Sequence, residues 1–482
     1  MKRSNNFILL IIVSVVIQAC TLSYPDIDDD FEQQWTAATY QANAYVIPSA
    51  PEALATRITM IREANATIDM TYFSWDKDTV GLVLMNELLI AAERGVKVRL
   101  TLDDLLVFNE NWLASVASHP NIQIKIFNPF KSRKSGWAGR IFDFAIHQKK
   151  LDHRLHEKYF NVDHQQMILG GRNIGDAYFG FSQKGNFFDM DVLFTGELIS
   201  AFADNYEQLW QGDYAVPIDE LIMIKQPGYD EFYHELTKVL NQNQPVVDAI
   251  YHAVANLVDA ELIAVHATPI FDSVAKLTNN KPYFRSRLEH EASIHLTDAS
   301  SVTISTPYAI KDEHYFSTIS KLAAQQTEVT LVTNSAKSND SAFIPAYYEQ
   351  YREELLDKQV NIFEYKANAE NKDHFYHEQT YYHNKAVIID EQVSYVGSSN
   401  FDPRSDYLNI EFGVLIESAK IAKAINSYIF EQKDLLWQVK RDSEAKTFWQ
   451  SDDEIIYDSP DYHSMHKLPD WVLRHLRLSI EL

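Results

Sequence analysis

Two stretches of the chain show the same order of amphipathic and alternating segments. In the first stretch, residues 51–65 have apolar positions at helical spacing, Ala66–Phe73 alternates, and a second helical segment over Val80–Arg94 ends at Gly95. The segment Val96–Leu102 alternates again, so strand, helix and strand follow one another as in a parallel or mixed sheet. Further strands are predicted over 121–127, 156–162, 166–169 and 187–195, and a helix over 197–211.

The second stretch repeats this order. Strands are predicted over 262–265, 302–305, 329–333, 360–364, 383–389, 393–396 and 410–416, and helices over 313–325, 342–356 and 418–437. Between the stretches, Pro217, Pro227 and an Asn-Gln run interrupt the pattern and indicate a boundary. The sequence therefore predicts an α/β fold with two related domains, each a mixed sheet flanked by helices. The predicted divisions are a first domain over 49–215, a linker over 216–260, a second domain over 261–440 and a tail over 441–482.

The first twenty residues resemble a bacterial lipoprotein leader. Lys2 and Arg3 precede an apolar run over 7–16 that is too short to span a bilayer comfortably. The sequence Ile17-Gln18-Ala19-Cys20 then resembles a lipobox, and Cys20 is the only cysteine in the chain. The alternative, a buried structural cysteine, fits poorly with a position directly after an apolar run.

This leader predicts a lipid anchor. We expect a signal peptide over 1–19, acylation of Cys20, and a tether over 20–48 that is rich in aspartate. Lipoproteins kept at the inner membrane usually have Asp after the cysteine, whereas this chain has Thr21. The prediction is therefore a protein of the bacterial cell envelope that faces the periplasm, at the outer membrane rather than the inner one.

Charge and composition narrow the range of partners. The chain has 482 residues, a hydrophobic fraction of 46% that is ample for packed cores, and a net charge of −24. Nucleic-acid binding needs clustered Lys and Arg to displace counterions, so no nucleic-acid partner is expected. If Cys20 is acylated, no cysteine remains for a disulfide.

A four-point motif occurs twice. It consists of His, Lys at +2, Asp at +7 and Asn at +17, and only two of the 17 histidines have it. A repeated constellation of this kind marks an internal duplication. Its members are His156, Lys158, Asp163 and Asn173 in the first copy, and His383, Lys385, Asp390 and Asn400 in the second.

The residue types in the motif suit phosphate chemistry. Alternation would put His and Lys on one face of a strand, where a cation beside an imidazole favours an anionic substrate. The turns Gly170-Gly171-Arg172-Asn173 and Gly397-Ser398-Ser399-Asn400 allow close approach of the backbone, and Asn adds a neutral donor. One histidine could attack phosphorus while the other donates a proton to the leaving oxygen. A lone histidine is more often structural, but two that share three further offsets favour catalysis.

The paired motifs resemble the phospholipase D superfamily, and more closely the C-type branch of the bacterial cardiolipin synthases. The resemblance extends from about residue 50 to the C-terminus. It also covers the stretches Thr67–Trp75, Leu102–Asp104, Phe127–Phe130 and Val332–Ser335. It implies two phospholipase D-like domains related by a pseudo-twofold axis, with both motifs meeting in one cleft.

The resemblance also implies roles for the motif residues. His156 would be the nucleophile that forms a phosphohistidine, and His383 would protonate the leaving alcohol and later deprotonate the acceptor. The sequence by itself treats the two histidines as interchangeable. Asp163 and Asp390 complete the motifs, and we expect them to hold the turn that ends each motif strand. The candidate phosphate-binding residues are Lys158, Lys385, Asn173, Asn400 and Ser398.

A nucleophilic histidine also needs an acceptor for its second ring nitrogen. Glu411, at +28 from His383, resembles the orienting carboxylate of the family. In the first half the matching position is Asp189 when Gly196 is aligned with Ser418, and Asp191 is the alternative. No histidine–carboxylate set has the spacing of metal ligands, so neither a metal nor another cofactor is expected.

One stretch differs from the acidic whole. Residues 131–158 hold eight Lys or Arg against three acids, with Trp137, Ile141, Phe142, Phe144 and Ile146 between them. A basic and aromatic helix suits an anionic lipid surface, and packing of the same helix on its own domain is the other interpretation.

Taken together, these features predict a membrane-anchored phosphatidyltransferase. Its expected partners are phospholipid substrates and the membrane surface, and partner proteins are not predicted. The rivals are a hydrolytic phospholipase D, a nuclease, and a non-catalytic lipid-binding lipoprotein.

Overall fold

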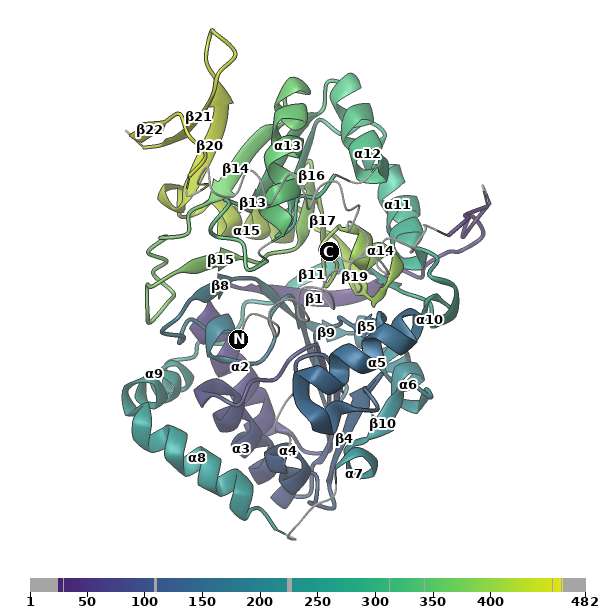
Figure 1. The fold of residues 1–482 in the computed structure, drawn as a ribbon, viewed down its shortest axis with the longest axis vertical. Helices are drawn as coiled ribbons and strands as arrows, with labels where there is room; N and C mark the ends of the chain where they lie inside the picture. Colours follow the sequence, from purple (N-terminus) through teal and green to yellow (C-terminus); the bar gives the residue numbers. More distant parts are fainter. Residues whose placement is uncertain are drawn as a thin grey trace, which may run out of the picture.

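The computed structural model describes residues 25–28, 30–107, 111–222, 228–311, 313–341, 343–452, 454–460 and 462. The protein has two domains, stacked one above the other in Figure 1, that share one sheet. No helix in these ranges is long and apolar enough to cross a membrane. The predicted signal peptide and Cys20 lie outside the described residues.

The first domain follows the predicted order of strands and helices. Ser49 caps α2 by accepting a hydrogen bond from the Glu52 amide, and Asp78 caps α3 through the Gly81 amide. The elements are β1 (Tyr40–Ile47), α2 (Ala50–Glu63), β2 (Thr67–Tyr72), α3 (Thr79–Glu93), β3 (Lys97–Asp103), α4 (Asn111–Val116), β4 (Ile122–Phe127), α5 (Gly136–Leu151), β5 (Arg154–Leu155), β6 (Tyr159–Val162), β7 (Gln166–Gly170), β8 (Asn186–Phe188), β9 (Asp191–Gly196), α6 (Leu198–Gln211) and β10 (Ala215–Pro217).

The second domain repeats the order of the main strands and helices. Its elements are β11 (Ile263–Phe271), α10 (Lys276–Asn279), α11 (Tyr283–Leu296), β12 (Ser301–Ser305), α12 (Glu313–Ala324), β13 (Glu328–Asn334), α13 (Ile344–Asp357), β14 (Asn361–Tyr365), β15 (Thr380–Tyr382), β16 (Ala386–Ile389), β17 (Val393–Gly397), α14 (Pro403–Tyr407), β18 (Asn409–Ile410), β19 (Phe412–Glu417), α15 (Ala419–Phe430) and β20 (Leu436–Arg441). This domain has no counterpart of α5, and it has the additional short helices α10 and α14.

The strand order has the same symmetry. The first domain pairs in the order β4-β3-β2-β6-β7-β9-β1, and the second in the order β14-β13-β12-β16-β17-β19-β11. The antiparallel pairing of β1 with β11 joins the two sheets at their centre. The two halves are therefore related by an approximate twofold axis between β1 and β11, which fits the predicted fold.

Strand β1 corrects one prediction. Residues 40–47 were expected to be part of the tether, but they form a strand with β9 on one side and β11 on the other. The sequence YQANAYVI has only small apolar residues, Ala42 and Ala44, at its buried central positions. Alternation of Ala with Gln and Asn is a weak strand signal, and pairing on both edges outweighs it.

The predicted linker holds helices. The segment contains α7 (Ile218–Leu221), α8 (Asp230–Gln242) and α9 (Gln244–Ala255). Phe232 and Leu236 of α8 and Val246 and Ile250 of α9 are buried in the core of the first domain. The final helix also ends earlier than predicted, at Phe430, and the chain turns into β20, β21 (Thr447–Ser451) and β22 (Glu454–Ile456), which extend the second sheet.

Two predicted strands are interrupted. The strand expected over 187–195 divides into β8 and β9 around Asp189, and the strand expected over 410–416 divides into β18 and β19 around Glu411. His156 and His383 likewise lie in irregular segments that precede β6 and β16, rather than within those strands. Each interruption releases one side chain from strict alternation, so that it can point to the junction of the two domains.

Candidate active site

Two short parallel sheets bring the motifs together across the domain boundary. β5, just before His156, pairs with β18 of the other domain, just before Glu411. By the same symmetry, β15 precedes His383 and pairs with β8, which precedes Asp189. The backbone amide of His156 donates to the Ile410 carbonyl at 3.0 Å, and that of His383 donates to the Phe188 carbonyl at 2.8 Å. Each histidine is thereby set beside the carboxylate of the other half.

His156 is bound to Glu411. The Nδ1 atom of His156 lies 2.9 and 3.0 Å from the two carboxylate oxygens of Glu411. The side chain of His156 is buried, and this burial lowers its pKa to about 4, although the Glu411 charge opposes the shift. Because a carboxylate can only accept, Nδ1 bears the proton and Nε2 keeps a lone pair at neutral pH.

His383 is bound to Asp189 in the equivalent way, with 2.6 Å between Nδ1 and the carboxylate oxygen. Burial and the nearby charge of Lys385 lower the pKa of His383, and Asp189 opposes this. Asp191, the alternative in the sequence, instead forms an ion pair with Arg57 at 2.9 Å. The close approach of Asp189 depends on Gly171, since a Cβ added there would lie 2.3 Å from a carboxylate oxygen.

The two motif lysines are both buried in this junction. Lys158 donates to the His156 carbonyl at 2.7 Å, and Lys385 donates to the His383 carbonyl at 2.6 Å. Burial, reinforced by the charge of Lys385, lowers the pKa of Lys158 far below its usual value, and burial lowers the pKa of Lys385 to about 8. Burial disfavours the protonated form of both lysines. An anion bound beside them would stabilise both protonated forms together.

The three polar residues expected to bind phosphate have different environments. The Asn173 amide accepts from the Ser74 backbone at 3.2 Å and donates to the Tyr178 hydroxyl at 3.0 Å. The Asn400 side-chain oxygen is buried without a hydrogen-bond partner among the described residues. Ser398 departs from the prediction, because its hydroxyl is fully buried and donates to Glu411. It supports the orienting carboxylate instead of facing a ligand.

The two motif aspartates lie away from the histidines. Asp163 accepts from the backbone amides of residues 65, 66 and 67, which lead into β2. Asp390 accepts from the amides of residues 300 and 301, which lead into β12. Both aspartates have positive φ at the turn after their strand. Their contacts match the turn-holding role expected from the sequence.

Aromatic side chains that the sequence analysis did not single out surround both imidazoles. Phe73 lies edge-on to His156, with ring centroids 5.5 Å apart. Tyr178 and Phe187 lie edge-on to His383 at 5.8 and 5.2 Å. Phe73 follows β2, Tyr178 follows the Asn173 turn and Phe187 lies in β8, but no offset in the sequence distinguishes them from core aromatics. Within the described ranges, no group of three or more His, Cys, Asp or Glu side chains is arranged to hold a metal ion.

The lysine environment gives a pH prediction. Because the pKa of Lys385 is lowered to about 8, the protonated form that binds an anion is lost as pH rises through that value. We expect affinity for dimethyl phosphate to fall about tenfold per pH unit above pH 8, with proton uptake on binding. Isothermal calorimetry between pH 6 and 9 in two buffers measures both effects.

Dimethyl phosphate remains a monoanion across this range, so the change reports on the protein. The control is Lys385→Met, which should bind weakly at every pH. Binding that is independent of pH in the wild type would contradict the interpretation of the lysine environment.

The fold and the site define a two-domain α/β protein in which duplicated histidine–lysine motifs meet at the domain junction. A family model described as "Cardiolipin synthase, PLD-like domain" matches residues 58–210 and 292–433. The chain therefore belongs to the phospholipase D superfamily, among its cardiolipin synthase-like phosphatidyltransferases.

Individual relatives agree with this assignment. The chain is 29% identical over 431 residues to cardiolipin synthase C of Escherichia coli K12. The alignment covers 85% of this chain and 89% of the relative. It is 23% identical over 368 residues to a cardiolipin synthase of Staphylococcus aureus, covering 76% and 62%. A solved phosphatidylserine synthase from Haemophilus influenzae has the same fold, with a TM-score of 0.61, 16% identity and coverage of 91% and 95%.

Proposed function

We propose that this protein transfers a phosphatidyl group between two alcohols through a covalent phosphohistidine, and that the product is cardiolipin. The observation that carries the proposal is the pair of crossed His–carboxylate contacts, His156 with Glu411 and His383 with Asp189, beside two buried lysines. A site with two histidines of this kind supplies both a nucleophile and an acid–base group. The family membership and the printed names of the relatives supply the lipid context.

In the first step, Nε2 of His156 attacks the phosphorus of a phospholipid. The N–P bond forms as the bond between phosphorus and the leaving oxygen breaks, and protonated His383 gives its proton to that oxygen. Burial lowers the pKa of both histidines, to about 4 for His156, so a neutral imidazole is available for attack at pH 7, and the choice of His156 as the nucleophile follows the family resemblance. Lys158 and Lys385 would stabilise the charge that builds up on the non-bridging oxygens.

In the second step, an alcohol takes the phosphatidyl group. His383 accepts the proton of the incoming hydroxyl, whose oxygen bonds to phosphorus as the N–P bond of His156 breaks. The proposed acceptor is the glycerol head of phosphatidylglycerol. Water in its place would give phosphatidic acid, the product of the rival hydrolase, so exclusion of water decides between the two outcomes.

Lipid mass spectrometry tests this function. The purified full-length protein would be incubated with vesicles of phosphatidylglycerol and phosphatidylethanolamine. Cardiolipin should appear with the wild type and be absent with His156→Ala. Phosphatidic acid as the sole product would show that the protein is a hydrolase and not a transferase. If folded protein changed no lipid, both the transferase and the hydrolase assignments would be wrong.

The proposed place of action is a membrane surface, with Cys20 as the lipid anchor, at the outer membrane facing the periplasm. Helix α5, which leads into β5 and His156, supports membrane contact (Figure 1). Its inner side is polar, since Arg140 donates to the Val107 carbonyl and Asp143 accepts from Ser132. Its outer side is apolar: Phe142 and Ile146 are 63% and 58% exposed.

Positive charge follows at the C-terminal end of α5, beyond a kink at His147. Lys149 and Lys150 are exposed in its last turn, in a protein whose net charge is −24. Burial of the apolar residues in the acyl region and attraction of the lysines to anionic headgroups would act together. Of the two interpretations of this helix, the lipid-facing one fits these contacts better.

Substitution of the exposed phenylalanine tests this surface. Protein lacking the first twenty residues, and hence the anchor, should bind phosphatidylglycerol vesicles, and Phe142→Ser should weaken binding about tenfold. Vesicle co-sedimentation gives the two partition constants. The matched control is Ile294→Ser, which changes an exposed apolar residue (74% exposed) on α11. Equal weakening by both substitutions would remove the special role of α5.

A further inference from the structure

Asp189, the carboxylate bound to His383, is held by a chain of hydrogen bonds that crosses the domain boundary. The Tyr428 hydroxyl donates to the backbone carbonyl of Asp189 at 2.6 Å. The same hydroxyl accepts from Nη2 of Arg172 at 3.1 Å. Arg172 belongs to the turn of the first motif, and Tyr428 lies on α15 of the second domain. The backbone at Asp189 is therefore fixed from both domains.

Arg172 fixes a second neighbour of the same imidazole. Its Nε donates to the Tyr178 carbonyl at 3.1 Å, and the Tyr178 ring lies edge-on to His383. Its Nη1 lies 3.5 Å from the Asp191 carboxylate. Arg172 is buried, and a planar guanidinium with several partners holds each of them in a defined direction. One side chain thus joins the aromatic ring beside the imidazole to the carboxylate that orients it.

The second motif differs at the matching position. Arg172 follows its motif histidine at +16, and the residue at +16 in the second copy is Ser399. The Ser399 hydroxyl accepts from the Phe401 amide at 3.1 Å and stays within its own turn. Glu411 is instead supported on its carboxylate by the Ser398 hydroxyl. The arginine link is therefore a feature of the half of the site that holds His383.

The charges around this chain keep Asp189 ionised. Burial raises the pKa of Tyr428 to about 12, so its hydroxyl keeps the proton that it donates. At Asp189, burial favours the neutral form, but the charges of Lys385 and His383, and then that of Arg172, lower the pKa below its usual value. An ionised carboxylate can only accept, so it holds the Nδ1 proton of the imidazole.

We propose that Arg172 and Tyr428 are positioning residues for Asp189. They set the place of this carboxylate and, through it, the orientation of His383 during both proton transfers. The inference rests on the proposed function for the role of His383 as acid and base. Without the Tyr428 hydroxyl the Asp189 backbone could shift, and a misplacement of about 1 Å can slow a reaction about 10²-fold.

Tyr428→Phe tests the chain with the smallest change. It removes the hydroxyl and keeps the ring, which stacks on Phe188 with centroids 5.0 Å apart. An activated donor such as phosphatidyl-p-nitrophenol releases nitrophenolate without a proton, so only the second step needs His383. We expect a first turnover at the wild-type rate and a steady state slowed at least about tenfold. Stopped-flow absorbance of the full-length protein measures both rates.

Arg172→Lys tests the other member of the chain. Lysine keeps the positive charge, but it lacks the planar group that donates to several partners at fixed angles. We expect the same division as in Tyr428→Phe, with the steady state slowed more than the first turnover. A thermal melt establishes that each variant folds.

Tyr206→Phe is the matched control, because Tyr206 is the counterpart of Tyr428 when the two halves are aligned. Its ring stacks on Tyr159 and Trp210 within the first domain. Loss of its hydroxyl should leave both rates unchanged.

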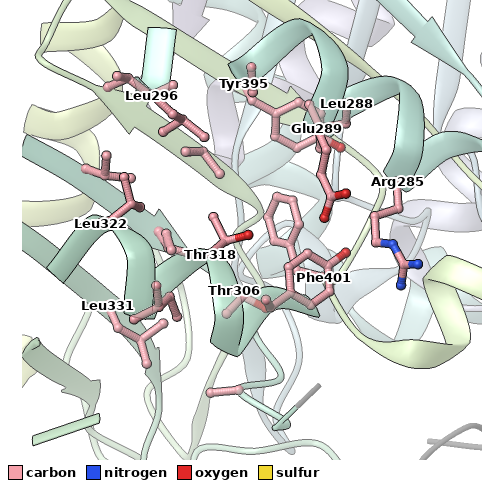
Figure 2. Close-up of a pocket in the computed structure, with 18 of the residues that line it drawn as sticks. Arg285, Leu288, Glu289, Leu296, Thr306, Thr318, Leu322, Leu331, Tyr395 and Phe401 are labelled. Carbon is pink, nitrogen blue, oxygen red and sulfur yellow. The ribbon is translucent and has the colours of Figure 1, made fainter. Parts of the chain in front are cut away.

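Leu322→Ala controls for general loosening of the second domain. Leu322 lines an apolar pocket between α11, α12 and the sheet, and neither Asp189 nor His383 is among the residues around that pocket (Figure 2). The substitution enlarges a space in the core, so it should lower the melting temperature. It should leave the ratio of the two rates unchanged, which separates positioning from stability.

The Nδ1 proton of His383 gives a readout that needs no reaction. In full-length protein with ¹⁵N-labelled histidine, its nuclear magnetic resonance signal is assigned by its absence from His383→Ala. We expect this signal to shift, and to exchange faster with water, in Tyr428→Phe. Tyr206→Phe and Leu322→Ala should leave it in place.

An unchanged signal in Tyr428→Phe, or equal slowing of its first turnover and its steady state, would overturn the inference. Equal effects of Tyr428→Phe and Tyr206→Phe would do the same. The outcome is separate from the proposed chemistry. A shifted signal without nitrophenolate release by the wild type would support the positioning role and remove the proposed reaction. Nitrophenolate release with an unchanged signal in Tyr428→Phe would do the reverse.

Discussion

His156→Ala should lower the rate of phosphatidyl transfer at least about 10⁴-fold, because it removes the atom that bonds to phosphorus in the proposed mechanism. His383→Ala should behave differently with an activated donor such as phosphatidyl-p-nitrophenol. Nitrophenolate leaves without a proton, so the first step survives, but the second step lacks its base. We expect a burst of about one nitrophenolate per chain from His383→Ala and none from His156→Ala.

Stopped-flow absorbance measures the burst, and mass spectrometry of the quenched protein locates the phosphatidyl adduct. The adduct should be on the peptide that contains His156. A burst from His156→Ala with an adduct on His383 would exchange the two roles. If both variants were about as active as the wild type, neither histidine would be catalytic, and the hypothesis of a non-catalytic lipid-binding protein would be favoured.

Glu411→Gln should lower the rate of the first step by about 10²- to 10⁴-fold while the protein stays folded. The carboxylate holds His156 with Nδ1 protonated, and an amide can present an N–H there and favour the wrong tautomer. The effect should fall on the burst, since the first step uses His156 as nucleophile. A thermal melt close to that of the wild type would separate this positioning effect from unfolding.

Asp189→Asn is the matched partner of this variant. Its carboxylate is bound to His383, so we expect a normal burst with the activated donor and a slow steady state afterwards. The two variants should therefore affect different steps. Each carboxylate acts on the histidine of the other domain: Glu411 contacts His156, and Asp189 contacts His383. Slowing of the burst by Asp189→Asn and not by Glu411→Gln would contradict the crossed assignment.

The sequence predicted the parts of the site that rest on local spacing. The repeated offsets selected both histidines and both lysines, which the structure brings together at the domain junction, and alignment of the halves selected Asp189, which contacts His383. The fold followed from periodicity because most strands and helices are strongly patterned. The structural comparison and the family match confirm the two-domain α/β fold.

Other features depend on contacts that no local pattern encodes. The pairing of β5 with β18 and of β8 with β15 decides which carboxylate meets which histidine, and each strand is only two or three residues long. Ser398 looked like a ligand residue in the turn, but the neighbouring Glu411 competes for its hydroxyl. The strand β1 was missed because its buried central positions are alanines.

The crossed pairing of histidines and carboxylates has a consequence for what one domain can do alone. A single domain holds a histidine without its carboxylate and a carboxylate without its histidine, so neither half contains one finished catalytic pair. A chain cut between α9 and β11, at residues 256–262, would be inactive as two separated fragments and would regain activity only on their reassociation. Catalysis in this protein therefore depends on contact between the two domains. A substitution that only loosens the junction would slow both chemical steps together.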